Sequence, residues 1–266
     1  MVWRLAIKLA YDGKEFFGFQ RQPDVRTVEG EILRALKAIG AIDSAKTSRF
    51  GGASRTDTGV SALGNVAAFD TEFSKGQILR ALNAVSEDVY FYGIAEVPSD
   101  FSPRRARQRW YRYFLQDLDL DLEKVTRCAK EFEGKHDFKH FSREGLGGTV
   151  KSIDDIKVFR VGDLVVIDFL AREYLWNMVR RMVAALSEVG KGRIVIESVR
   201  DSLLGKEACF GLAPAEFLVL MDVVYDFDFE YDCPSTLKRK LRLGSDLTMI
   251  KLAFYGDLTD RCRKQV

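Results

Sequence analysis

The segment from Gly52 to Leu63 reads GASRTDTGVSAL, and its Asp57 is the carboxylate best placed in the sequence to do chemistry. Asp-Thr-Gly is also the tripeptide that holds the catalytic carboxylate of aspartic proteases. Those enzymes need two carboxylates that share a proton, yet the tripeptide occurs once in the 266 residues and polar residues precede it. Arg55 is two residues away, and a nearby guanidinium favours an ionised carboxylate. The pattern therefore indicates a permanent anion or a nucleophile.

Other residues with metal or redox chemistry are sparse. The two histidines and the four widely spaced cysteines, which contain no CxxC pair, argue against a zinc site and against a disulfide framework. We therefore expect no metal, no cofactor and a reducing, cytoplasmic compartment. No apolar run approaches membrane-spanning length, and the first residues alternate in polarity instead of forming a signal sequence.

Positive charge is concentrated in one short segment. The net charge of +2 alone argues neither for nor against a nucleic-acid partner. Between Arg104 and Arg112, however, the sequence RRARQRWYR has five arginines and two aromatic residues without an acid. Such a segment is typical of a surface that contacts phosphates.

The elements that would position Asp57 begin with an alternating strand. Apolar residues from Trp3 to Tyr11 alternate with Arg4 and Lys8, which predicts one buried and one solvent-facing side. Thr27 is expected to cap a following helix. A short strand over 65–69, a helix around 78–85 and a strand over 89–97 complete this part of the chain.

After Pro98 the same order of elements starts again. The pattern predicts a strand over 107–115, a helix over 121–132, strands over 153–160 and 164–170, a helix over 173–189 capped by Gly190, and a strand over 217–225. Each half thus has the order of a split βαβ, or ferredoxin-like, domain. We predict an α+β fold of two ferredoxin-like halves, 1–98 and 99–227, with antiparallel sheets, and an appendage over 228–266. Helices on one face would leave the other free for an extended ligand such as RNA.

Six segments resemble, in order and approximate spacing, the TruA-type tRNA pseudouridine synthases. They are KLAYDGKEFFGFQRQPDVRTVEGEI, ASRTDTGVSALGNVAAFD, RWYRYFL, GKHDFKHFS, YLWNMVRRMV and LAPAEFLVLMDVVY, and they run from about Leu5 to Tyr225. One segment alone is weak evidence, but six in the right order are specific. The resemblance implies that the sheets of the two halves join across a central basic cleft with Asp57 at its floor. It also implies a homodimer that acts on tRNA, in the anticodon stem-loop at positions 38 to 40.

The resemblance also implies roles for individual side chains. Asp57 matches the catalytic Asp, Tyr111 the tyrosine that stacks on the flipped uracil, and Arg180 the basic partner of the Asp. Arg55 is expected to help hold the nucleotide outside the stack, and Leu218 to pack against the target base. Phosphate contacts are expected from five further basic residues: Lys14, Arg21, Arg104, Arg105 and Arg107.

Pseudouridine formation breaks the bond between C1′ and N1 of uridine and rejoins C1′ to C5. A carboxylate could add to C6 of the ring, bond to C1′ or act as a base, and the sequence does not choose among these. Each residue also has an ordinary interpretation: Asp57 as a turn residue, Tyr111 and Leu218 as core, and Arg55 as a solvated loop residue. Arg181 competes with Arg180 as the partner of Asp57.

Two other classes of protein remain as alternatives. The first is a non-catalytic RNA-binding protein built on paired ferredoxin-like domains, which would stack bases on aromatic strands. The first half, however, has no basic aromatic strand. The second is a phosphatase that uses an aspartyl nucleophile and magnesium. Such enzymes commonly have a second Asp two residues after the nucleophile, where this chain has Gly59.

Overall fold

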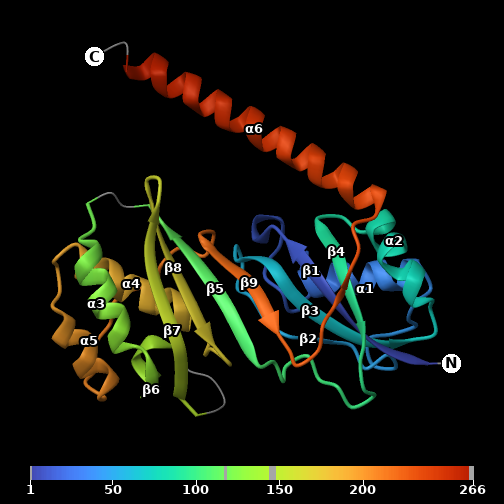
Figure 1. Cartoon of the computed structure of the whole chain (residues 1–266), viewed down its shortest axis with the longest axis horizontal. Helices are drawn as coiled ribbons and strands as arrows, with labels where there is room; N and C mark the ends of the chain where they lie inside the picture. Colours follow the sequence, from blue (N-terminus) through green and yellow to red (C-terminus); the bar gives the residue numbers. More distant parts are fainter. Residues whose placement is uncertain (1, 117–118, 144–147, 264–266) are drawn as a thin grey trace.

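A computed structural model describes residues 2–116, 119–143 and 148–263 of the chain. It is a mixed α+β fold around one large sheet, which has the strand order β10-β4-β1-β3-β9-β5-β8-β7-β6, while β2 pairs with β3 (Figure 1). The strands before Pro98 are β1 (Trp3–Tyr11), β2 (Gly51–Gly52), β3 (Ser61–Thr71) and β4 (Val89–Glu96). Those after it are β5 (Gln108–Leu115), β6 (Gly134–Asp137), β7 (Val150–Val161), β8 (Leu164–Ala171), β9 (Leu218–Val224) and β10 (Glu230–Tyr231).

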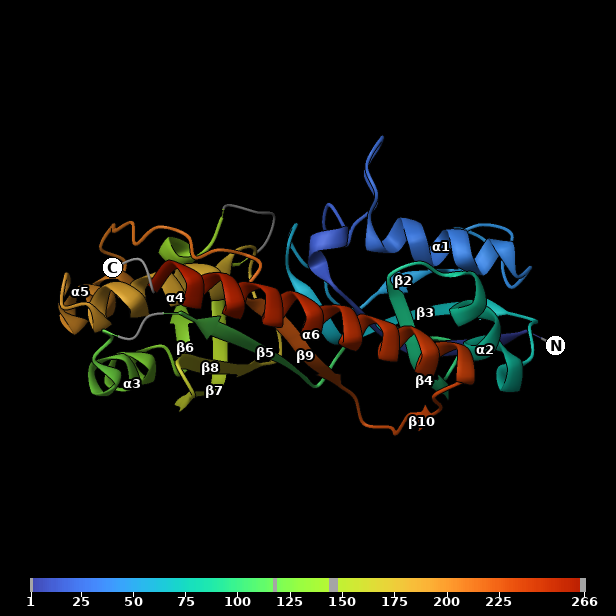
Figure 2. The same cartoon turned by 90° about the horizontal axis from the view of Figure 1, so that it is seen from above.

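The helices of the two parts lie on the same side of the sheet. The first part carries α1 (Val28–Ala38) and α2 (Lys75–Val85), and the second carries α3 (Leu122–Glu131), α4 (Met178–Gly190) and α5 (Ile196–Leu203). In Figure 1, α1 and α4 lie behind the strands, and Figure 2 shows them along one side of the molecule. The apolar faces of α1 and α4 close a core against the sheet, with residues such as Ile32, Leu36, Met182 and Leu186 buried.

The two parts meet at a short seam in the centre of the sheet. There β3 pairs with β9 in parallel through two residue pairs, Ser61 with Val219 and Ala62 with Leu220. Within each part the strands have the same order. Numbered along the chain within its part, and with β6 left aside, the fourth strand lies beside the first, then the third and the second: β4-β1-β3-β2 and β9-β5-β8-β7. Because only these two residue pairs join β3 and β9, side-chain contacts such as Lys8 with Asp222 also stabilise the junction between the two parts.

Most local predictions are confirmed, including the Thr27 cap, whose side chain accepts a hydrogen bond from the Gly30 N–H. The predicted solvent-facing side of β1 is wrong. Arg4 and Lys8 are buried, because Arg4 pairs with Asp70 at 2.8 Å and Lys8 pairs with Asp222 across the seam. An alternating pattern does not distinguish a solvated side from a side whose charges are neutralised by neighbouring strands.

The predicted helix over 173–189 also needs correction. It begins five residues later, at Met178, and Gly190 is its last residue and not its cap. A Cβ on Gly190 would lie 2.6 Å from Val125, so this glycine permits close packing of α4 on α3. The strand predicted over 65–69 is longer, from Ser61 to Thr71.

The segment expected to be an appendage contains regular structure. It adds β10 to the edge of the sheet beside β4, and it continues as the long helix α6 (Ser235–Arg263). The helix begins against α2, where Leu237 is buried, and then extends away from the strands (Figures 1 and 2). The prediction over 228–266 includes residues 264–266, which lie outside the described residues.

Candidate active site

Asp57 lies in a loop between β2 and β3, and buried hydrogen bonds hold this loop in place. The Asn65 amide, fully buried, donates to the Ser54 carbonyl at 3.0 Å and to the Tyr11 hydroxyl at 3.2 Å, while its oxygen accepts from the Ser54 N–H at 3.3 Å. The Tyr11 hydroxyl bonds Thr56 at 2.8 Å. These buried hydrogen bonds fix the backbone on both sides of Arg55.

The turn after Asp57 depends on a glycine. The Val60 N–H donates to the Asp57 carbonyl at 3.1 Å, and Gly59 between them has φ +86°. That backbone conformation is easily adopted only by glycine. The Thr-Gly that follows Asp57 therefore turns the chain into β3 and leaves the carboxylate at the surface of the loop.

The second part of the chain holds the same loop through a buried arginine. Arg109 on β5 donates from Nε to the Ser54 hydroxyl at 3.0 Å and from Nη2 to the Ala53 and Arg104 carbonyls at 2.9 and 3.0 Å. It also donates to the Arg172 carbonyl. Arg109 thus ties the Asp57 loop to β5 and to the segment before α4.

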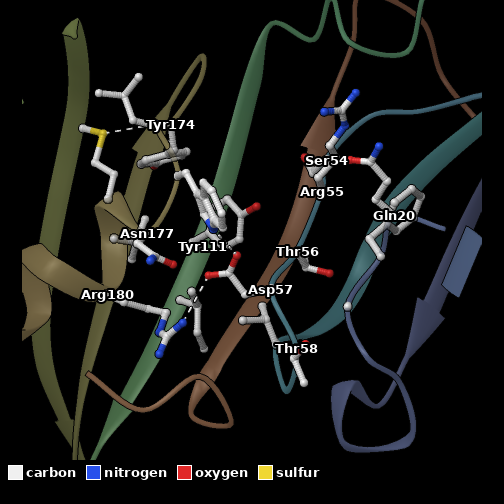
Figure 3. A pocket seen from close by; sticks show the side chains of 18 of the residues that line it. Gln20, Ser54, Arg55, Thr56, Asp57, Thr58, Tyr111, Tyr174, Asn177 and Arg180 are labelled. Carbon is white, nitrogen blue, oxygen red and sulfur yellow. Dashed lines mark hydrogen bonds and ion pairs between the residues drawn. The ribbon is translucent and has the colours of Figure 1, made fainter. Parts of the chain in front are cut away.

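Both oxygens of the Asp57 carboxylate accept a hydrogen bond from the segment that begins α4. Trp176 Nε1 donates to Oδ1 at 3.0 Å, and Arg180 Nη1 donates to Oδ2 at 3.2 Å (Figure 3). The Arg180 Nε also donates to the Ala213 carbonyl at 2.7 Å, which orients the guanidinium. The Asp57 side chain remains 24% exposed, so the held carboxylate is still accessible from the pocket.

The short segment between β8 and α4 supplies the aromatic wall of the site. Asn177 adopts φ +63°, a left-handed conformation that asparagine tolerates better than most residues. This turn precedes Met178, and Tyr174 and Trp176 both line the pocket. Figure 3 shows Tyr174 close to Tyr111. The Arg143 guanidinium lies 4.2 Å from the Trp176 ring centroid, a cation–π contact.

Tyr111 lies beside Asp57 on β5. Its ring meets that of Tyr174 edge to face, with centroids 5.2 Å apart. Burial raises the pKa of Tyr111 to about 12, while nearby Arg109 and a hydrogen bond with Ser54 act in the opposite direction. The phenol is therefore protonated at neutral pH and can donate a hydrogen bond, but it is not a base there.

These residues line one pocket of about 1000 Å³ on the side of the sheet that carries α4. We expected an extended ligand to use the face without helices. The pocket lies instead on the face with α4, between the start of that helix and the segments around residues 17–22 and 52–60 of the first part. Among its lining residues are two acids, Asp57 and Glu173, and five arginines: Arg55, Arg104, Arg109, Arg143 and Arg180. The excess of positive charge suits an anionic ligand such as RNA.

The structure brings six of the predicted site residues to this pocket: Arg55, Asp57, Arg104, Tyr111, Arg180 and Leu218. Arg180, and not its neighbour Arg181, contacts the carboxylate. Four predicted phosphate-contacting residues are exposed but do not line the pocket: Lys14, Arg21, Arg105 and Arg107. Arg107 lies 3.6 Å from Asp226 in an exposed ion pair.

Sequence reasoning missed three residues of the site, namely Arg109, Trp176 and Arg143. The motif YLWNMVRRMV includes Trp176, and RWYRYFL begins at Arg109, but neither motif shows which side chain points toward Asp57. The one sequence feature that could have indicated Trp176 is its position beside an asparagine just before a helix. No feature of the sequence indicates Arg143.

No group of three or more His, Cys, Asp or Glu side chains within residues 2–116, 119–143 and 148–263 is arranged to hold a metal ion. In the same ranges, no helix is long and apolar enough to cross a membrane.

Comparison with known proteins identifies the family to which this chain belongs. The tRNA pseudouridine synthase family model matches residues 128–226. The tRNA pseudouridine synthase A of Pyrococcus abyssi is 48% identical over 84% of this chain and 85% of its own length. The protein of the same name from Pyrococcus furiosus is 44% identical over 96% of this chain and 97% of its own length.

The chain therefore belongs to the tRNA pseudouridine synthase A family and is an enzyme of the isomerase class. Among solved structures, an archaeal box H/ACA Nop10–Cbf5 complex aligns over 69% of this chain and 44% of that chain. The TM-score is 0.33 and the identity 15%, a likeness too weak to carry an argument.

Proposed function

We propose that this protein isomerises uridine to pseudouridine in the anticodon stem-loop of tRNA, at positions 38 to 40. Asp57 is the catalytic carboxylate, Arg180 its ionic partner and Tyr111 the ring that stacks on the flipped uracil. The observation that carries the proposal is the Asp57 carboxylate itself, which is held by Arg180 and Trp176 at an arginine-rich pocket yet is open on one side.

The reaction is an isomerisation, so nothing is added to or lost from the nucleotide overall. The N1–C1′ bond breaks, the uracil rotates, C5 bonds to C1′, and a proton leaves C5 while N1 gains one. Asp57 serves this sequence by adding to C6, by bonding to C1′ or by taking a proton. Arg180 pairs with the carboxylate and balances its negative charge when it is regenerated.

A stacked uridine must leave its helix to reach this pocket, at a cost of a few kcal/mol. Arg55, exposed at the rim, contacts the displaced nucleotide, and Leu218 packs against the base from below. Phosphates outside the pocket are bound by exposed basic residues, namely Lys14, Arg21, Arg104, Arg105 and Arg107. The two parts of the chain are ferredoxin-like halves, 1–98 and 99–227, followed by the segment 228–266. The active form is a cytoplasmic homodimer without a metal or other cofactor.

Site mapping tests this proposal directly. Purified protein is incubated with unmodified tRNA transcripts without added metal, and pseudouridines are located by carbodiimide treatment and primer extension. We expect stops in the anticodon stem-loop that are absent with Asp57→Ala. Stops elsewhere in the tRNA would keep the reaction and overturn the target. Tight tRNA binding without any stop would overturn the reaction in favour of a binding protein.

A further inference from the structure

Trp176 combines two features that a surface tryptophan does not need. It is 51% exposed, yet the only polar atom of its side chain, Nε1, donates to Asp57 Oδ1 at 3.0 Å. Its ring is held beneath the Arg143 guanidinium, and its carbonyl accepts from the Arg143 N–H at 2.9 Å. The indole is therefore fixed from two sides, while Nε1 points to the reacting carboxylate.

We propose that Trp176 is a positioning residue for Asp57, which fixes the rotation of its carboxylate for attack on the nucleotide. The inference rests on the proposed catalytic role of Asp57. With Arg180 alone, one oxygen would be held and the group could turn about its Cβ–Cγ bond. With Trp176 as well, each oxygen accepts one donor and keeps one lone pair for the substrate.

The chemical type of the donor matters here. Arg180 already supplies the positive charge that balances the carboxylate. The indole N–H is neutral and adds direction without a second cation, so it orients the anion while withdrawing less of its nucleophilicity. Trp176 lies two residues before α4 and Arg180 lies in the first turn of that helix, so neighbouring parts of one segment supply both donors to Asp57.

Three variants separate the N–H donor from the aromatic ring. Trp176→Phe keeps a ring but removes the donor. Trp176→His keeps a donor, since Nε2 of histidine is as many bonds from Cβ as Nε1 of tryptophan, but loses the larger ring. Trp110→Phe is the matched control, because the Trp110 Nε1 is buried without a hydrogen-bond partner in the described part of the chain.

We expect Trp176→Phe to lower kcat by about 10-fold or more, as loss of a hydrogen bond to a charged group does. The KM for tRNA should stay within about 2-fold, because the donor contacts Asp57 and not the RNA. Trp176→His should recover part of the lost kcat, and Trp110→Phe should match the wild type. An unchanged kcat in Trp176→Phe, an equal loss in the His variant, or a change in KM alone would overturn the positioning role.

A measurement without substrate keeps this inference separate from the proposed reaction. In protein labelled with ¹⁵N-tryptophan, the indole N–H signal of Trp176 is assigned by its loss in Trp176→Phe. We expect Asp57→Ala to move that signal more than those of Trp3 and Trp110. An unmoved signal overturns the contact even in an active enzyme. A moved signal in a protein that forms no pseudouridine would retain the contact and overturn the proposed function.

Discussion

Two arginine–aspartate pairs on opposite faces of the sheet show how the same residue types can serve different ends. On the face away from the pocket, Arg112 of β5 donates to both oxygens of Asp168 on β8, at 2.7 and 2.9 Å. The Asp168 side chain is 7% exposed, and Arg112 stacks near Trp110 and Phe159. In the pocket, Arg180 makes a single contact of 3.2 Å with Asp57, whose side chain is 24% exposed.

The two pairs differ in how much of each carboxylate is still accessible to a ligand. Each oxygen accepts one hydrogen bond in both cases, but the two donors to Asp168 belong to one guanidinium directly opposite it on the adjacent strand, and this carboxylate is buried. In the pocket the two donors come from different residues on one side of Asp57, so the other side stays open. The comparison teaches that a carboxylate can be oriented by charge and still be available to a substrate, provided that its donors do not surround it.

The largest expected effect is on turnover at Asp57. Asp57→Asn keeps the shape of the side chain and removes the anion, so kcat should fall by about 10⁴-fold, as for other catalytic carboxylates. The affinity for tRNA should change little. Single-turnover kinetics and filter binding measure the two quantities, and a parallel loss of binding would contradict a purely chemical role.

Loss of Arg180 should have the next largest effect on turnover. Arg180→Ala leaves Asp57 with the neutral Trp176 donor alone, and we expect kcat to fall by about 100-fold, the scale of removing one preorganised donor. Arg181→Ala is the control, because this neighbour makes no contact with Asp57. Equal losses in the two variants would show that the helix and not the ion pair is responsible.

Loss of the pair between Arg112 and Asp168 should lower the stability of the fold and leave turnover unchanged. Asp168→Asn leaves Arg112 without its carboxylate, and we expect the free energy of unfolding to fall by about 2 kcal/mol. This is less than the ~3–5 kcal/mol for a wholly buried pair, because Arg112 is partly exposed. Urea denaturation measures the change, and kcat of the folded variant should match the wild type. A loss of turnover without a loss of stability would break the distinction between the two pairs.

Tyr111 lies on the pocket face of the strand that carries Arg112, so it tests the stacking role there. If stacking on the uracil dominates, Tyr111→Phe should retain kcat within about 5-fold, whereas Tyr111→Ala should lose more, since stacking of a base on an aromatic ring contributes about 1–3 kcal/mol. Both variants are assayed under single-turnover conditions. Equal losses would assign the role to the hydroxyl.

The smallest expected effect is that of pH on the rate of the wild type relative to that of Tyr111→Phe. Burial raises the pKa of Tyr111 to about 12, so the hydroxyl of the folded enzyme is protonated throughout the range from pH 7 to 10. The wild-type rate divided by that of Tyr111→Phe should therefore not change over this range. A ratio that falls toward pH 10 would mean that the phenol ionises more easily than its burial indicates.

Several structural predictions succeed because they depend on near neighbours in the chain. Thr27 caps α1 through its own local hydrogen bond, and the alternation of β5 places Tyr111 and Tyr113 on the buried side. The predictions that fail depend on distant partners. Lys8 is buried because Asp222 lies across the seam, and α4 begins late because Asn177 turns the chain so that Trp176 faces Asp57.

By itself, the sequence determined the order of the main strands and helices, the Asp57 loop with its necessary Gly59, and the resemblance to the family. These properties follow from periodicity, capping and backbone preference, which act over a few residues. Only the tertiary structure decided which donors meet the carboxylate and which face of the sheet holds the pocket. Trp176 and Arg180 lie 119 and 123 residues from Asp57. Contacts over such separations form when α4 and the Asp57 loop meet across the β3–β9 seam, which no local pattern encodes.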